Sequence, residues 1–87
     1  MPTLPFNPKP DWDDANKHTV TEDTDIRVNN PSTSRLYFEV RSVPDLPTID
    51  VKICSWVPDG DFAGMQLKAG ETLFLAGKGA NASVLVG

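Results

Sequence analysis

Apolar and other side chains alternate with a period of two over most of the chain, and this is the feature that most constrains its fold. Such alternation places one row of side chains in a core and the other toward solvent or a second surface. The clearest runs lie at 36–40, 49–53 and 82–86, and turn-forming groups such as 29–32 and 77–81 separate the runs. Because no segment repeats apolar residues at helical spacing with caps, we expect almost no helix.

From these runs we predict an all-β fold, namely a small antiparallel β-sandwich or a Greek-key barrel of five to seven short strands. The pattern leaves the choice between sandwich and barrel open. The expected strands are 18–28, 35–43, 48–57, 65–76 and 82–86. The first of them is expected to break near 22–24, and the fourth near 68–70, where charged and turn-forming residues interrupt the alternation.

Residues 1–16 form a different zone, which holds four of the eight prolines. Proline lacks an amide donor and fixes φ, so we expect extended geometry and no strand inside a sheet. Leu4 and Phe6 lie between these prolines and Trp12 follows the last of them, and such apolar anchors suit docking. At about 3.1–3.5 Å per residue, this segment can wrap its own domain or reach a neighbour. We therefore divide the chain into an extended N-terminal arm, 1–16, and a β-sandwich domain, 17–87.

Size and charge narrow the possible partners. A domain of 87 residues buries only roughly 60–65% of its extended-chain surface and usually needs a disulfide, a metal or a partner subunit. One cysteine and one histidine argue against the first two, so oligomerisation or docking remains. The first 25 residues hold six acids and two bases, whereas the rest is balanced. Without clustered bases or a long apolar run, we expect no nucleic-acid binding and no membrane span.

Several short motifs could carry chemistry, and each has a plainer explanation. Asp59-Gly60-Asp61 lacks the distal glutamate of a calcium loop and fits a hairpin tip. The acidic stretch 11–14 has no glycine to converge its carboxylates, and the turn at 77–79 precedes a strand instead of the helix of a phosphate loop. His18 is expected to face solvent, and no nucleophile elbow accompanies it. We therefore expect no catalytic residue, no metal and no cofactor.

The aromatic residues fall out of phase with the main apolar rows. Tyr37, Trp56 and Phe74 occupy outward positions, and Cys54 is expected opposite the row at 49–53, as a packed residue. Three explanations are open: the sandwich buries these aromatics itself, they form an interface between subunits, or they form a flat carbohydrate platform. The candidate interface residues are Leu4, Phe6, Trp12, Tyr37 and Trp56.

The C-terminal half carries a resemblance to a known class of proteins. The segments QLKAGETLFL (66–75) and ANASVLV (80–86), with 26–31 and 36–40, resemble small virion structural proteins of tailed bacteriophages. Within these, the chain is similar to capsid decoration (cement) proteins over about residues 18–87. The resemblance implies a non-enzymatic all-β module that is made in the bacterial host cytoplasm and binds the capsid surface. Its implied partners are further copies of itself, as trimers or similar clusters, and the major capsid protein.

Two alternatives to the capsid role stay open from the sequence. The first is a tail- or fibre-associated virion protein, since no decoration-protein fingerprint is present. The second is a carbohydrate-binding or host-adhesion β-sandwich, which would need Trp56 and Tyr37 exposed and coplanar.

Overall fold

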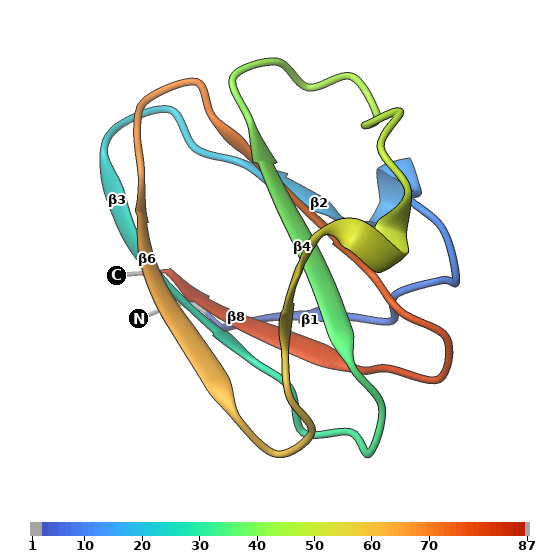
Figure 1. The fold of residues 1–87 in the computed structure, drawn as a ribbon. Helices are drawn as coiled ribbons and strands as arrows, with labels where there is room; N and C mark the ends of the chain where they lie inside the picture. Colours follow the sequence, from blue (N-terminus) through green and yellow to red (C-terminus); the bar gives the residue numbers. More distant parts are fainter. Residues whose placement is uncertain (1–2, 87) are drawn as a thin grey trace.

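Eight strands form two stacked antiparallel sheets in the computed structural model, which describes residues 3–86 (Figure 1). Sheet A has the strand order β1-β8-β3-β6, and sheet B has the order β2-β7-β4-β5. The all-β sandwich predicted from the alternation is confirmed, with eight strands in place of five to seven. In chain order, the elements are β1 (Thr3–Phe6), η1 (Asp14–Asn16), β2 (Lys17–Thr19), β3 (Thr24–Asn29), β4 (Leu36–Arg41), η2 (Val51–Ile53), β5 (Ser55–Val57), β6 (Phe62–Leu67), β7 (Thr72–Ala76) and β8 (Ala82–Val86).

The main core lies between the sheets and follows the predicted alternation. Strands β3 and β8 of sheet A and strands β4 and β7 of sheet B each turn one row of apolar side chains toward it. We call this cluster the inter-sheet core. Its buried members are Val20, Ile26, Val28, Leu36, Val57, Leu67, Leu73, Leu75, Ala80, Ala82 and Val84.

A second buried cluster lies on the outer face of sheet B. Phe74 and Ala76 alternate with the inter-sheet residues of β7, so they point away from the main core, yet they are fully buried. Trp12, Val51 and Cys54 cover them, and the Trp12 ring meets the Phe74 ring edge-on at 6.5 Å. We call these five residues the outer core. Strand β7 is therefore buried on both faces, and irregular segments form a third layer over it.

The N-terminal segment belongs to the fold of its own domain. β1 is an edge strand of sheet A and pairs with β8, in register Leu4↔Val84 and Phe6↔Ala82. The extended geometry expected for this segment agrees with β1, which the list of expected strands omitted; an edge strand is paired on one side only and so tolerates Pro5. The sequence allowed this segment either to wrap its own domain or to reach a neighbour, and in the structure it wraps its own domain. Residues 1, 2 and 87 of the predicted arm and domain lie outside the described residues.

After β1 the chain crosses from sheet A to the outer face of sheet B. The Gly77 amide donates a hydrogen bond to the Lys9 carbonyl at 2.8 Å, and Trp12 enters the outer core. Asp13 caps η1 by accepting from the Ala15 amide at 2.8 Å. The chain then continues as β2, which pairs with β7. The segment 3–19 therefore pairs with both sheets, through β1 in sheet A and β2 in sheet B.

The expected strand at 48–57 is wrong over most of its length, since only 55–57 is extended in a sheet. The Asp50 carboxylate accepts from the Lys52 amide at 3.0 Å and starts the turn η2. This local bond competes with strand pairing. Val51 and Cys54 consequently point inward together, whereas Ile53 is 72% exposed. The prediction that Cys54 lies opposite an apolar row 49–53 is therefore also wrong.

The predicted interruptions of the first and fourth strands are confirmed. β2 ends at Thr19 and β3 begins at Thr24, while β6 ends at Leu67 and β7 begins at Thr72. The Val20 amide donates to the Glu71 carbonyl at 3.0 Å, which ties the two interruptions together.

Asn30 is a buried polar residue whose side chain links two loops by hydrogen bonds. Its side-chain amide donates to the carbonyls of Ser34 at 2.7 Å, Val57 at 3.0 Å and Pro58 at 3.2 Å. Its carbonyl oxygen accepts from the Ser32 amide at 3.1 Å. These bonds hold the β3–β4 loop against the turn that follows β5. We predicted a turn at 29–32 but not this role of Asn30.

Candidate binding surfaces

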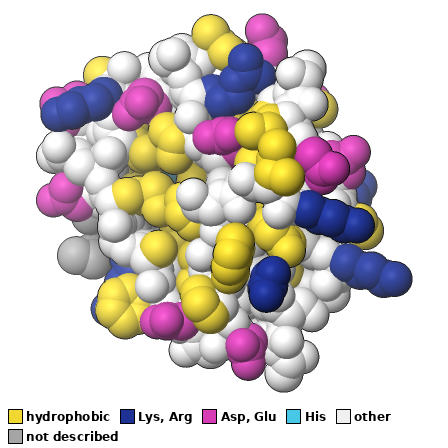
Figure 2. Space-filling model, in the orientation of Figure 1, with side chains coloured by type: hydrophobic (Ala, Val, Ile, Leu, Met, Phe, Trp, Pro, Cys, Tyr) yellow, Lys and Arg dark blue, Asp and Glu magenta, His cyan; other side chains and the backbone are white. Residues whose placement is uncertain are grey.

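One side of the sandwich is open. In the orientation of Figure 1, Figure 2 shows hydrophobic side chains gathered between β6 and β4. Phe38 and Val40 of β4 and Ala63 and Met65 of β6 are only partly buried against the inter-sheet core. The side is open because the three-residue β5 pairs with β4 only over Leu36–Phe38. Core side chains beyond that point are uncovered.

A charged side chain protects the part of β4 that β5 leaves unpaired on this side. Val40 lies beyond the stretch that β5 pairs with, and its amide donates to the Glu39 carboxylate at 3.2 Å. A charged side chain on an edge discourages a further strand from pairing there. Strand β6 has neither a charged residue nor a proline in 62–67, although the Asp61 carboxylate that precedes it accepts the Phe62 amide at 2.8 Å.

A hollow with aromatic and basic walls lies on the outer face of sheet B. It has a volume of about 530 Å³ and is lined by Pro10, Ser34, Arg35, Tyr37, Val51, Lys52, Gly77 and Lys78. Trp56 lies beside it, with the Arg35 guanidinium 4.7 Å from the Trp56 ring centre. The ion pairs found within residues 3–86 do not involve Arg35, Lys52 or Lys78. Their charges face a cavity whose lining holds no acid.

The exposed aromatic pair does not form a flat surface. Tyr37 and Trp56 are cross-strand partners on β4 and β5, and their ring centres lie 6.3 Å apart. The ring planes are tilted by 57°, and Tyr37 is half-buried. A flat carbohydrate platform needs coplanar exposed rings, so this geometry offers a walled hollow instead.

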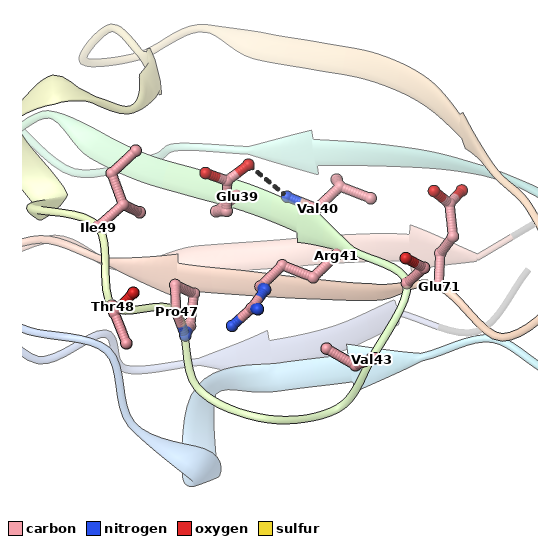
Figure 3. Close-up of a pocket in the computed structure, with 9 residues that line it drawn as sticks. Glu39, Val40, Arg41, Val43, Pro47, Thr48, Ile49 and Glu71 are labelled. Atoms are coloured by element: carbon pink, nitrogen blue, oxygen red, sulfur yellow. Dashed lines mark hydrogen bonds between the residues drawn. The ribbon is translucent and has the colours of Figure 1, made fainter.

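A further hollow of about 580 Å³ lies beneath the loop that follows β4. Figure 3 shows Glu39 and Glu71 at opposite ends of it, with Arg41 between them. The Arg41 guanidinium donates to the carbonyls of Asp45 at 3.1 Å and Leu46 at 3.0 Å, so it holds the loop in place. Since Glu39 is bonded to the Val40 amide, these charged groups serve the local structure and do not converge as an acid–base pair.

Cys54 is a packed thiol, as predicted. Burial raises the pKa of the Cys54 thiol above its ordinary value of 9.0, and the nearby carboxylates of Glu39 and Asp50 raise it further. Its sulfur lies 3.8 Å from a Glu39 oxygen. A thiol held in its protonated form is a poor nucleophile.

The other motifs with possible chemistry form turns and edges. Asp59-Gly60-Asp61 makes the predicted turn between β5 and β6, with Gly60 at a φ of 71°. His18 is opposite Leu73 in register, and cross-strand partners share a face. It is half-buried toward the inter-sheet core, which corrects the expectation that it faces solvent. Within residues 3–86, no three His, Cys, Asp or Glu side chains are grouped so as to hold a metal ion.

The five candidate interface residues differ in how much surface they offer. Leu4 and Phe6 pack against the inter-sheet core. Trp12 is 8% exposed, and its indole nitrogen donates to the Ile49 carbonyl at 2.9 Å. Trp56, at 46% exposed, is the most accessible of the five, and Tyr37 lines the hollow. The sequence reasoning missed β6 as a surface, although its uncharged run was a usable signal.

Comparison with protein-family models, curated proteins and solved structures finds no match to this chain. Across residues 3–86, no helix has the length and apolar character needed to cross a membrane.

Proposed function

We propose that this chain is a non-enzymatic virion structural protein of the capsid decoration type, which works by being held between neighbouring protein surfaces. The open side of the sandwich carries this proposal. It presents half-buried core side chains beside an uncharged edge strand, which is a surface suited to protein contact. The sequence resemblance to phage decoration proteins supplies the virion context.

The contact with the major capsid protein is assigned to the hollow and Trp56. Exposed Trp and Arg side chains are typical anchors of protein interfaces, and here the Arg35 guanidinium lies over the Trp56 ring. The arm anchors Leu4, Phe6 and Trp12 are engaged in their own domain. These three residues therefore hold the fold, and the exposed residues are left for docking. Many weak contacts on a lattice add up through avidity.

Co-sedimentation with capsids tests the proposal. Heads assembled from the major capsid protein of the same genome are mixed with the purified chain and pelleted. We expect the wild-type chain to pellet with the heads and Trp56→Ala to bind at least about tenfold more weakly, a difference of about 1.4 kcal/mol. Lys68→Ala, in a turn away from the hollow, is the matched control. No pelleting by the wild-type chain would overturn the capsid role.

A second candidate function is host adhesion through a charged sugar, on the capsid, tail or fibre. The observation that favours it is the hollow, where an aromatic wall stands beside three basic side chains that make no ion pair within residues 3–86. A glycan bearing carboxylates or sulfates fits that combination. A glycan array with Trp56→Ala as control separates this candidate from capsid docking.

A further inference from the structure

We propose that two copies of this chain join through their β6 strands, which pair antiparallel about a two-fold axis at Gly64. Sheet A of one copy then continues into sheet A of the other. This inference rests on the proposed function, in which the chain is held between neighbouring protein surfaces, and makes one of those surfaces a second copy of the chain.

The four edge strands differ in how well they resist pairing. β2 and β5 have three residues each, and β1 has four with Pro5 among them. Short length and proline are both devices that protect sheet edges. β6 has six residues, pairs with β3 alone and carries neither a charge nor a proline. Beyond the Phe62 amide, which the Asp61 carboxylate binds, it is therefore the one long edge among residues 3–86 without these protections.

The backbone groups that face outward from β6 follow from its register. β3 and β6 pair without a bulge from Thr24↔Leu67 to Asn29↔Phe62, and the Asn30 amide donates to the Asp61 carbonyl at 2.9 Å. Bonding direction alternates along an antiparallel strand, so odd-numbered residues of β6 bond to β3. Phe62, Gly64 and Gln66 then point their amides and carbonyls at the open edge. Consistently, the Phe62 amide is bonded to the Asp61 side chain at 2.8 Å.

A two-fold axis at Gly64 satisfies the rules of strand pairing. Residues opposite one another must share a face, and Gly64 opposite its own copy places Phe62 opposite Gln66 and Ala63 opposite Met65. About four new backbone hydrogen bonds can form without displacing the Asp61 carboxylate. The Ala63 and Met65 side chains, half-buried in one copy, gain cover from the other.

A second copy fits this edge because the strand is self-complementary. With no charge in 62–67, two β6 strands meet without like-charge repulsion, and glycine leaves the axis free of side chains. The Arg27 guanidinium lies 3.7 Å from the Phe62 ring centre and stays within its own copy. The contact is short for a stable interface, so we expect a dimer that forms as concentration rises.

Substitutions at Gly64 test the pairing, and the free energy of unfolding of each variant is measured beside it because Arg27 is the cross-strand partner of Gly64. A Cβ built at Gly64 meets no heavy atom within 4 Å, and its φ is not in the left-handed region. Gly64→Lys places two ammonium groups at the axis, so we expect dimerisation at least about tenfold weaker in sedimentation equilibrium. Gly64→Thr keeps the edge neutral and is the matched control that stays dimeric. Gln66→Pro, which removes an outward amide, is the second variant.

The outcomes separate this inference from the capsid role. A dimer lost in Gly64→Lys and kept in Gly64→Thr supports the β6 pair. A chain that stays monomeric, forms trimers or dimerises equally in both variants overturns it, even if it pellets with heads. If the chain is monomeric and Gly64→Lys loses head binding while Gly64→Thr keeps it, the β6 edge pairs with a strand of the capsid protein. That result also overturns the β6 dimer. A dimer that ignores heads overturns the capsid role alone.

Discussion

The inter-sheet core and the outer core are both well buried, but different kinds of chain build them. Paired strands contribute almost every residue of the inter-sheet core, and their alternation is visible in the sequence. In the outer core only Phe74 and Ala76 come from a strand, while the other three residues lie in irregular segments.

This difference shows that alternation along a strand identifies the side chains that point away from the main core but not the residues that cover them. An outward aromatic such as Phe74 can be covered by a partner, by solvent-facing neighbours or by a loop of its own chain. Here Trp12, which is 62 positions away in sequence, provides the cover. Substitutions in the two cores, described next from the largest expected effect to the smallest, measure how far each one holds the fold.

Truncation of Trp12 is expected to have the largest effect. Trp12→Ala removes the ring that packs on Phe74 and leaves the Ile49 carbonyl without its donor, so we expect a loss of about 3–5 kcal/mol in the free energy of unfolding. Leu75→Ala, in the inter-sheet core, is expected to lose about 2–5 kcal/mol. Urea unfolding followed by circular dichroism measures both. A loss below that of the exposed Trp56→Ala would show that the outer core does not support the fold.

Gly77→Ala is expected to weaken the fastening between the outer layer and β4. A Cβ at this position would lie 2.6 Å from the Arg35 carbonyl oxygen, and the backbone φ is 156°. We expect a loss of about 1–3 kcal/mol, together with weaker protection of the Gly77 amide that bonds to Lys9. Gly60→Ala, at a left-handed turn where a Cβ meets no atom, isolates the backbone part of the effect. Equal losses in both variants would contradict the steric account.

The Cys54 thiol gives the outer core a dependence on alkaline pH. Its pKa is raised in the folded state, mainly by burial, so the folded chain holds this proton more strongly than the unfolded chain does. The stabilisation is full below the ordinary pKa of 9.0 and is lost as pH rises through the folded value. Urea unfolding at pH values on either side of 9.0 should therefore show a steeper decline in wild type than in Cys54→Ala. Parallel slopes would exclude the thiol as the cause.

The smallest expected effect comes from two exposed aspartates. The pKa of Asp13 is lowered by the bond from the Ala15 amide, and that of Asp23 by the bond from the Ala69 amide, with a lysine helping each. A lowered pKa stabilises the fold above the ordinary value of 3.8, and the stabilisation is lost as pH falls through the folded value. Asp13→Asn and Asp23→Asn should each flatten the acid limb of stability against pH slightly. If the acid limb is unchanged in both variants, other carboxyl groups cause the loss of stability at low pH.

Alternation predicted the sandwich because the inter-sheet core obeys it at almost every position. It failed where local side-chain bonds compete, as in 48–54, where the Asp50 carboxylate starts a turn. It also failed for β1, since proline rules out a central strand but not an edge. Of the candidate site, the outward placement of Tyr37 and Trp56 was predicted correctly. The hollow could not be predicted, because its lining joins four segments that only the folded chain brings together.

The register Thr3↔Leu85 lays the first and last strands side by side, so the two ends of the described chain leave the domain at one place. A peptide appended at either end would emerge there. For the same reason, a short linker could close the backbone into a ring, and new ends could be cut at the turn around Gly60 with every strand keeping its neighbours.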